Sequence, residues 1–392
     1  MPRPPHSPDD APPPVPGPAE TRAALRLLAA ACAVGLALWL GWATALVGPD
    51  SPLLRWGRSG STAWVLHRAD ALAADPALRA HPGGQIVWAV GSSITREAFD
   101  EDAVNAALEG QGSPYRLRKL GQNRGAAALT APVLARLPVQ PGDLVIHNVA
   151  LENFRADWVS WTRLPMTTAG QLLGPGQLWA VDDRALPHKL EQAAAQPPAF
   201  WAWHDEVMGG LSAWGLGLFF YFQAPKPAKA GDLLRFHTHL RGRRMVPDQL
   251  EAERARYAMT AADLDLSPDQ LHQAGIAQLR AHCAENGAQF MLLDIPTSAW
   301  DQWAWQDASA RAAWDRLRDG WPELVVAPQL PGDHFYDRRH PNRLGRAVLS
   351  DWLVGFLAHP GPGDRRRPPQ SEAVPFPWAE AADDLAADVE EG

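Results

Sequence analysis

The chain has 392 residues, of which 46% are hydrophobic and 20% are charged, and its formal net charge at pH 7 is −8. This length suffices for one large domain or two small ones, and the negative charge argues against nucleic acid as a partner, because a phosphate backbone needs a basic surface. Cys32 and Cys283 are the only cysteines in the sequence, which excludes a disulfide scaffold and a cysteine-rich zinc module.

Residues 1–21 are rich in proline, which removes backbone donors and fixes φ, so we expect a disordered tail there. The chain then carries no charge from Leu27 to Gly48. A helix of this length, rising 1.5 Å per residue, spans about 33 Å, which is enough for the hydrocarbon core of a bilayer. We therefore predict a transmembrane helix over residues 22–48, through which the protein attaches to a membrane.

A cleaved signal peptide is the alternative interpretation of this segment, since Ala43-Thr44-Ala45 resembles a cleavage site. The apolar run is longer than the roughly 7–15 residues of a signal peptide, which favours an uncleaved anchor. Arginines flank the two ends in equal number, so the positive-inside rule assigns no orientation.

Residues 49–84 are expected to form a linker and a first helix, and residues 85–360 an α/β domain. In this domain short apolar strands alternate with amphipathic helices, which is typical of a parallel sheet covered on both faces. The predicted fold class is therefore α/β, with a doubly wound, mostly parallel sheet. The predicted strands are 85–90, 143–149, 289–295 and 324–327, and predicted helices include 268–286 and 343–357.

An insertion at about 155–250 interrupts this alternation and is rich in tryptophan and proline. Its uncharged run over residues 209–222 is too short to span a membrane, and we interpret it as a buried helix or as a lid or membrane-facing patch. The tryptophans fit either core packing or a glycan-binding groove. Residues 361–392 are expected to form a second disordered tail with an acidic end.

The first candidate for chemistry follows the first predicted strand. Ligands of open parallel sheets bind at the carboxyl ends of the strands, and Gly91-Ser92-Ser93 stands at such an end. A serine in a strand-to-helix turn exposes its hydroxyl near the backbone N–H groups of the helix. An ordinary N-cap serine is the alternative interpretation.

A second group of polar residues precedes the last predicted helix. Asp337 and His340 are three residues apart in a turn there, so both side chains can point toward one cleft. A carboxylate that binds an imidazole fixes its tautomer, which lets the imidazole act as a base toward a serine.

These two features together resemble the SGNH (GDSL-type) hydrolase family. The resemblance depends on G-x-S at a strand end and on the motif D-x-x-H-P-N-x-x-G at residues 337–345, and it covers most of residues 85–358. It implies that Ser93 is the nucleophile, that His340 is the general base, and that Asp337 orients His340.

A metal site is the competing interpretation of the same stretch, because Asp333, His334, Asp337 and His340 offer nitrogen and oxygen ligands. The continuation of the motif to Gly345 fits the serine hydrolases better. We therefore expect no metal and no cofactor.

The first family motif is altered in this chain, and the second is matched. Ser92 replaces the aspartate of G-D-S. The second motif contributes a glycine whose backbone N–H faces the oxyanion, and the block at residues 120–125 looks like it. Gly125 is the preferred match and Gly121 the alternative.

The third motif of the family, G-x-N-D, is poorly matched. The family asparagine should fall near Glu152, so Asn153 fits only with a shift of one residue, whereas Asn148 lies inside the predicted strand. Asn153 is the predicted side-chain donor to the oxyanion. Losing one such donor costs roughly 10²–10³ in rate, so slow turnover is one consequence of this departure.

The G-S-S variant behind a membrane helix is similar to envelope-facing members of the family, which include polysaccharide O-acetylation proteins. The resemblance implies a membrane-anchored serine esterase or O-acyltransferase that acts on an ester or an acylated cell-envelope glycan, with an acyl-transfer partner in the membrane. The domain would then be extracytoplasmic, in the periplasm or at the cell surface. The alternative function is a catalytically weak component that binds or assembles an envelope polysaccharide system.

Overall fold

The computed structural model describes the greater part of the predicted α/β domain and one helix before it. The described residues are 18–47, 61–123, 125–156, 258–268, 270–295, 297–298 and 307–358, together with residues 164, 170, 173, 176, 178–180, 182 and 184–195. The predicted acidic tail at 361–392, the uncharged run at 209–222 and residues 1–17 of the predicted first tail lie outside them, so these stay predictions.

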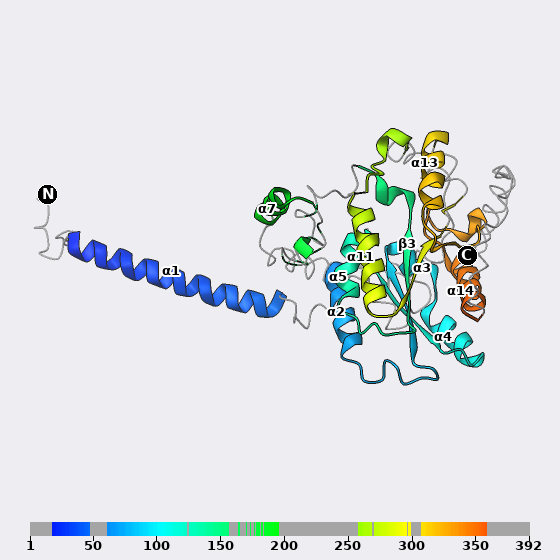
Figure 1. The fold of residues 1–392 in the computed structure, drawn as a ribbon. Helices are drawn as coiled ribbons and strands as arrows, with labels where there is room; N and C mark the ends of the chain where they lie inside the picture. The colour runs from blue at the N-terminus through cyan, green and yellow to red at the C-terminus, as the bar shows by residue number, and fades with distance from the viewer. Residues whose placement is uncertain are drawn as a thin grey trace, which may run out of the picture.

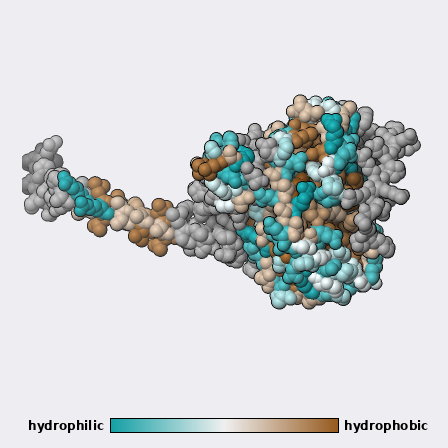
Figure 2. Space-filling model, in the orientation of Figure 1, coloured by the Kyte–Doolittle hydropathy of each residue, from teal (hydrophilic) through white to brown (hydrophobic). Residues whose placement is uncertain are grey.

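Helix α1 (Pro18–Val47) covers residues 22–47 of the segment predicted to cross a membrane. It also includes residues 18–21, so the expected disorder is wrong for these four residues, since proline is tolerated in the first turn of a helix and Pro18 can begin one. Its described large apolar side chains between Leu25 and Leu38 are exposed, and Figure 2 shows hydrophobic surface along this helix. In the part of the chain that the structure describes, no helix combines the length and the apolar character that crossing a membrane requires. Membrane attachment therefore stays a prediction.

A parallel sheet forms the centre of the α/β domain. Its strands are β1 (Gln85–Gly91), β2 (Tyr115–Gly121), β3 (Leu144–Val149), β4 (Gln289–Asp294) and β5 (Leu324–Val326). All neighbouring pairs are parallel, in the order β2-β1-β3-β4-β5. The strand order reverses at β1, and ligands of such sheets bind beside this reversal, outside the carboxyl ends of the strands.

Helices cover both faces of the sheet (Figure 1). Buried side chains form one hydrophobic cluster on each face, with Val145 of β3 in the first and its neighbour Ile146 in the second, as the alternation of a strand requires. The α/β class is confirmed, and the all-parallel sheet is compatible with a doubly wound fold. The first face carries α2 (Thr62–Ala73), α5 (Ala127–Leu134), α11 (Leu271–Glu285) and α13 (Ala308–Asp319), and the second carries α3 (Ser93–Ala98), α4 (Glu101–Gly110) and α14 (Arg343–Ala358).

The predicted elements agree with the observed ones near their expected bounds. The four predicted strands are β1, β3, β4 and β5, the two predicted helices are α11 and α14, and α2 is the helix expected within residues 49–84. Other described elements are α7 (Leu186–Ala195) and the short 3-10 helices η3 (Leu151–Phe154), η6 (Ala261–Asp263) and η7 (Gly332–His334).

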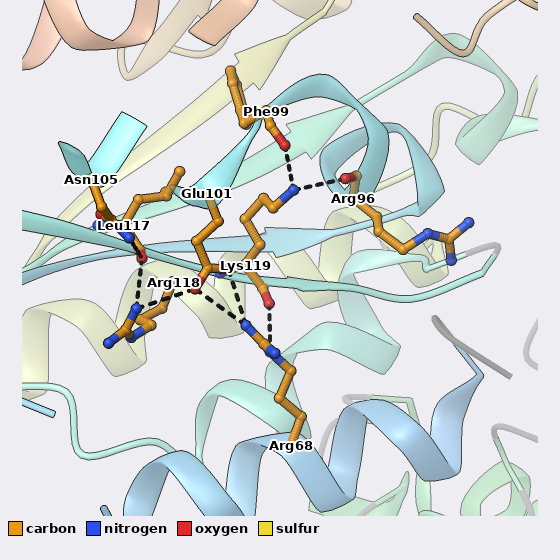
Figure 3. Close-up of polar contacts among 8 residues, drawn as sticks. All are labelled: Arg68, Arg96, Phe99, Glu101, Asn105, Leu117, Arg118 and Lys119. Atoms are coloured by element: carbon orange, nitrogen blue, oxygen red, sulfur yellow. Dashed lines mark hydrogen bonds and ion pairs between the residues drawn. The ribbon is translucent and has the colours of Figure 1, made fainter. Parts of the chain in front are cut away.

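Strand β2 is absent from the predicted strands. Its sequence, YRLRKLG, lacks the continuous apolar run of β1 and β3, because it lies at the edge of the sheet and carries charged side chains. Glu101 of α4 accepts hydrogen bonds from Arg118 of β2 at 3.2 Å and from Arg68 of α2 at 3.0 Å (Figure 3). Charges suit an edge strand because they discourage pairing with another chain.

Candidate active site

The turn between β1 and α3 positions Ser93 at the carboxyl end of the sheet. Ser92 is the N-cap of α3, and its Oγ accepts a hydrogen bond from the N–H of Ile94 at 3.2 Å. Ser93 is the first residue of the helix. The capping role that the sequence left open for this turn therefore belongs to Ser92, and the Ser93 hydroxyl is available for another partner.

Gly91 is required at the end of β1 by its backbone and by its neighbours. Its φ is +146°, a conformation that residues with a Cβ rarely adopt. A Cβ at this position would lie 2.4 Å from Asn148 Oδ1 and 2.8 Å from Thr95 Oγ1. The glycine thus lets a side chain of β3 reach the turn that carries Ser93.

Asn148 is that side chain, and its position differs from the sequence expectation, which preferred Asn153. Asn148 Oδ1 accepts hydrogen bonds from the Ser92 N–H at 2.7 Å and from the Thr95 hydroxyl at 2.5 Å. Only 1% of Asn148 is exposed, and among the described residues its Nδ2 has no hydrogen-bond partner. Asn148 therefore ties β3 to the Ser93 turn. No signal in the sequence identifies this role, because it depends on the pairing of β3 with β1.

A tight loop before α14 carries Asp337 and His340. An antiparallel bridge joins Phe335 to Pro341, and the Tyr336 N–H donates to the carbonyl of His340 at 3.1 Å. Asp337 Oδ1 accepts the backbone N–H of His340 at 2.7 Å. These contacts fix the carboxylate beside the imidazole.

The continuation of the loop motif has a local structural reason. Asn342 Oδ1 accepts the N–H groups of Leu344 at 2.9 Å and Gly345 at 3.2 Å, which satisfies two free donors at the start of α14. Asn342 Nδ2 donates to the carbonyl of Asp333 at 2.6 Å. A Cβ on Gly345 would lie 2.4 Å from the carbonyl oxygen of His334, so only glycine fits there.

The structure brings Ser93, His340 and Asp337 together in one chain of hydrogen bonds. Ser93 Oγ lies 2.8 Å from His340 Nε2, and His340 Nδ1 lies 2.7 Å from Asp337 Oδ2. Because an ionised carboxylate only accepts hydrogen bonds, the proton between them belongs to Nδ1. Nε2 is then free to accept the proton of the Ser93 hydroxyl.

The protonation states of His340 and Asp337 follow from their burial and from the charge of each on the other. Burial alone lowers the pKa of His340, but the Asp337 carboxylate outweighs it and raises that pKa above its usual value. Burial works against the ionisation of Asp337, yet the charge of His340 and its hydrogen bonds hold the pKa of Asp337 below its usual range. The arrangement keeps Asp337 ionised and makes His340 a stronger base.

Tyr336 is a further residue at the site that the sequence analysis did not single out. Its ring stacks on the imidazole of His340, with ring centroids 5.5 Å apart and planes 9° from parallel. Nothing in the linear motif identifies Tyr336, because the contact depends on how the loop folds back on itself.

Gly125, the predicted oxyanion donor, packs against the β1–α3 turn. A Cβ there would lie 2.6 Å from the carbonyl oxygen of Gly91. Its backbone N–H donates to the carbonyl of Gln122 at 3.2 Å, so this donor already has a partner. The alternative glycine, Gly121, pairs with Gly91 across the two strands. The Ser93 N–H lies at the start of a helix, where the helix supplies no acceptor.

Asn153, the predicted side-chain donor, lies in η3 and is 8% exposed. Its N–H donates to the carbonyl of Ala150 at 3.0 Å, and its own carbonyl accepts from Gln270 Nε2 at 3.1 Å. These backbone contacts hold η3 against the start of α11. No hydrogen bond described for Asn153 reaches Ser93 or His340.

The four residues of the alternative metal site form two separate pairs. His334 Nδ1 lies 2.9 Å from Asp333 Oδ1, whereas His340 pairs with Asp337. Among the residues that the structure describes, no group of three or more histidine, cysteine, aspartate or glutamate side chains is placed to hold a metal ion.

Comparison with known proteins adds no assignment. No protein-family model matches this chain, and no curated protein sequence matches it.

Proposed function

We propose that the protein is a serine ester hydrolase or O-acyltransferase of the SGNH type. The observation that carries the proposal is the hydrogen-bonded series Ser93–His340–Asp337 at the carboxyl ends of a parallel sheet. A hydroxyl, an imidazole and a carboxylate in this order form the arrangement that activates a serine as a nucleophile.

In the proposed reaction Ser93 Oγ attacks the ester carbonyl carbon while its proton moves to His340 Nε2. The resulting imidazolium is stabilised by the Asp337 carboxylate. Collapse of the tetrahedral intermediate breaks the bond to the alcohol, which takes the proton from His340, and leaves the acyl group on Ser93. A water molecule or a glycan hydroxyl then gives its proton to His340 and attacks the acyl carbon. As the bond from the acyl group to Ser93 Oγ breaks, His340 returns the proton to Oγ.

The oxyanion of the intermediate needs hydrogen-bond donors. The Ser93 N–H is the proposed first donor because its helix supplies no acceptor for it. Gly125 and Asn153 keep their predicted roles as further donors only if the substrate displaces the Gln122 carbonyl from the Gly125 N–H and the Asn153 side chain reaches the site.

The proposed substrate is an ester or an acylated cell-envelope glycan. We further propose that residues 22–48 attach the protein to a membrane, with the domain extracytoplasmic and an acyl-transfer partner in that membrane. The exposed apolar side chains of α1 support the attachment. Deleting residues 1–60 should release the protein into the soluble fraction of lysed cells, and retention in the membrane fraction would contradict the attachment.

A second candidate function is a catalytically weak member of the same fold that binds an envelope polysaccharide. The occupied N–H of Gly125 favours it, because a missing oxyanion donor costs roughly 10²–10³ in rate. The two candidates share the residues of the site and differ in turnover.

A fluorophosphonate probe tests the proposal, because it reacts covalently with an activated serine. We expect labelling of the wild type, p-nitrophenyl acetate hydrolysis, and loss of both in Ser93→Ala. Ser113→Ala, in the turn before β2, is the matched control and should keep both. Absence of labelling and turnover in the folded wild type, at a pH where His340 is neutral, would overturn the enzyme function and leave the binding component.

A further inference from the structure

Glu152 occupies the place where the third family motif calls for an asparagine, and its surroundings are unlike those of an oxyanion donor. It lies in η3, directly after β3, and only 4% of it is exposed. Its Oε1 lies 2.5 Å from a terminal guanidinium nitrogen of Arg339 and 3.4 Å from one of Arg338. These two arginines are the residues between Asp337 and His340.

The Glu152 carboxylate and the guanidinium groups of Arg338 and Arg339 depend on one another because Glu152 and Arg338 are buried and Arg339 is largely so. The side chains of Arg338 and Arg339 are 7% and 12% exposed, and that of Glu152 is 5% exposed. Burial raises the pKa of the Glu152 carboxyl, and the charges of Arg338, His340 and Arg155 offset only part of that rise. Removing one partner of such a group leaves an uncompensated buried charge, which is strongly unfavourable.

The same loop is held from a second side by the segment after β4. The backbone N–H and the hydroxyl of Ser298 both donate to the carbonyl oxygen of Arg338, at 3.2 Å and 2.9 Å. Glu152 therefore holds the loop from the carboxyl end of β3, and Ser298 holds it from the carboxyl end of β4. Both strands belong to the core of the sheet, which makes them rigid supports.

We infer that Glu152 is a positioning residue, which holds the Asp337–His340 loop against the sheet through its ion pairs with Arg338 and Arg339. The inference rests on the proposed function, since it assigns Glu152 a part in placing His340 against Ser93. No hydrogen bond described for Glu152 reaches Ser93 or His340, so it holds the loop through the two arginines, and its charge also acts on the imidazole of His340.

The role of Glu152 can be tested by the pH dependence of kcat/KM. His340 must be neutral to accept the Ser93 proton, so kcat/KM rises with pH through the pKa of His340. A negative charge nearby raises this pKa, as Asp337 and Glu97 do, and a positive charge lowers it, as Arg96 does. Neutralising Glu152 should therefore move the acidic limb of the profile to lower pH, and neutralising Arg338 should move it to higher pH.

The experiment compares Glu152→Gln and Arg338→Met with the wild type in p-nitrophenyl acetate hydrolysis across pH. Glu101→Gln is the matched control, because Glu101 also binds two arginines, Arg68 and Arg118, but lies in the network at the β2 edge shown in Figure 3. Thermal melting of each variant reports whether it folds.

We expect kcat of Glu152→Gln to fall about 10- to 100-fold, since misplacing a catalytic group by about 1 Å costs this much, with KM for the small ester changed less than about twofold. The acidic limbs of the two variants should move in opposite directions. Glu101→Gln should melt at a lower temperature but keep the wild-type kcat and acidic limb.

The inference is overturned if Glu152→Gln keeps the wild-type kcat and acidic limb, or loses no more than Glu101→Gln does. If Glu152→Gln does not melt cooperatively, Arg338→Met decides, and an unmoved acidic limb in that variant overturns the inference. A folded wild type that neither hydrolyses the ester nor reacts with the fluorophosphonate probe contradicts the proposed function itself. An active wild type with unmoved limbs in both variants contradicts only the role of Glu152.

Discussion

The hydroxyl of Ser93 and the imidazole of His340 are 247 positions apart in the chain, yet Oγ and Nε2 lie within 2.8 Å of each other. The first follows β1 and the second precedes α14, so the sheet and the closing helix together set this distance. Hydrogen bonds to backbone groups fix both ends: Asn148 holds the turn of Ser93, and Asp337 holds the loop of His340.

Replacing Asp337 by asparagine should lower kcat by about 10⁴-fold, because an amide favours the wrong tautomer of His340. It should also move the acidic limb of kcat/KM to lower pH, since Asp337 raises the pKa of His340. Steady-state hydrolysis across pH measures both effects. Asp333→Asn is the control, because that carboxylate pairs with His334 instead and its side chain is 52% exposed. Equal losses in the two variants would contradict the role of Asp337.

Replacing Asn148 by alanine should reduce both turnover and stability. The Ser92 N–H and the Thr95 hydroxyl lose their acceptor, and unsatisfied buried groups cost about 1–3 kcal/mol. The displaced Ser93 turn should lower kcat by about 10-fold or more. Ester hydrolysis and urea denaturation measure the two losses.

The matched control for Asn148 is Asn105→Ala. Asn105 Oδ1 accepts the N–H of Leu117 at 2.7 Å, so it ties a helix to a strand in the same way, away from Ser93. We expect a comparable loss of stability without a loss of kcat. If turnover falls equally in both variants, Asn148 has no special role in placing Ser93.

The stability of the domain should fall in mild acid because of two buried histidines. His147 of β3 and His272 of α11 are fully buried, with ring centroids 5.5 Å apart. Burial lowers the pKa of His147 from 6.5 to about 3, and burial together with the charge of His147 lowers that of His272. The unfolded chain binds protons near pH 6.5 and the folded chain does not, so stability is present above that pH and is lost progressively below it.

For His147 alone the loss at about pH 5 amounts to about 2 kcal/mol. Urea denaturation between about pH 7 and about pH 5 measures it, and His147→Leu should reduce the loss by that amount. His67→Leu, at an exposed position of α2, is the control and should leave the acid loss unchanged. An unchanged acid loss in His147→Leu would contradict this source of pH dependence.

Replacing Gly275 by alanine should separate two packed helices. A Cβ there would lie 2.0 Å from the backbone nitrogen of Ala128, so α11 and α5 touch through their backbones. Overpacking of this kind costs about 1–3 kcal/mol. Gly355→Ala is the matched control in α14, where a Cβ meets nothing within 4 Å and the better helix former should add about 0.5–1 kcal/mol. Denaturant midpoints measure both changes, and a stable Gly275→Ala would show that the helices can move apart.

Short apolar runs in the sequence predicted four of the five strands of the sheet. Strands β1, β3, β4 and β5 are mostly apolar runs, because nearly all of their side chains are buried or half-buried by helices on both faces. Strand β2 escaped prediction because its position at the sheet edge leaves one face to charged side chains, and no local pattern states which strand will be at the edge.

In the candidate site, too, some features follow from local sequence and others depend on the tertiary structure. Ser93, Asp337 and His340 could be selected from short motifs because a strand-to-helix turn and a helix cap need particular residues at particular spacings. Their meeting could not be derived from the motifs, since it depends on the parallel register of the sheet and on the packing of α14. The sequence by itself thus determined the α/β class and the three candidate residues.

Tertiary structure alone decided how the surrounding residues act. Asn148 reaches the Ser93 turn because β3 lies beside β1 in a fixed register, and Glu152 meets Arg338 because the ends of β3 and the loop before α14 converge. These contacts join segments distant in the chain. Their energies come from burying donors and charges that must then be satisfied by whichever groups the fold brings near.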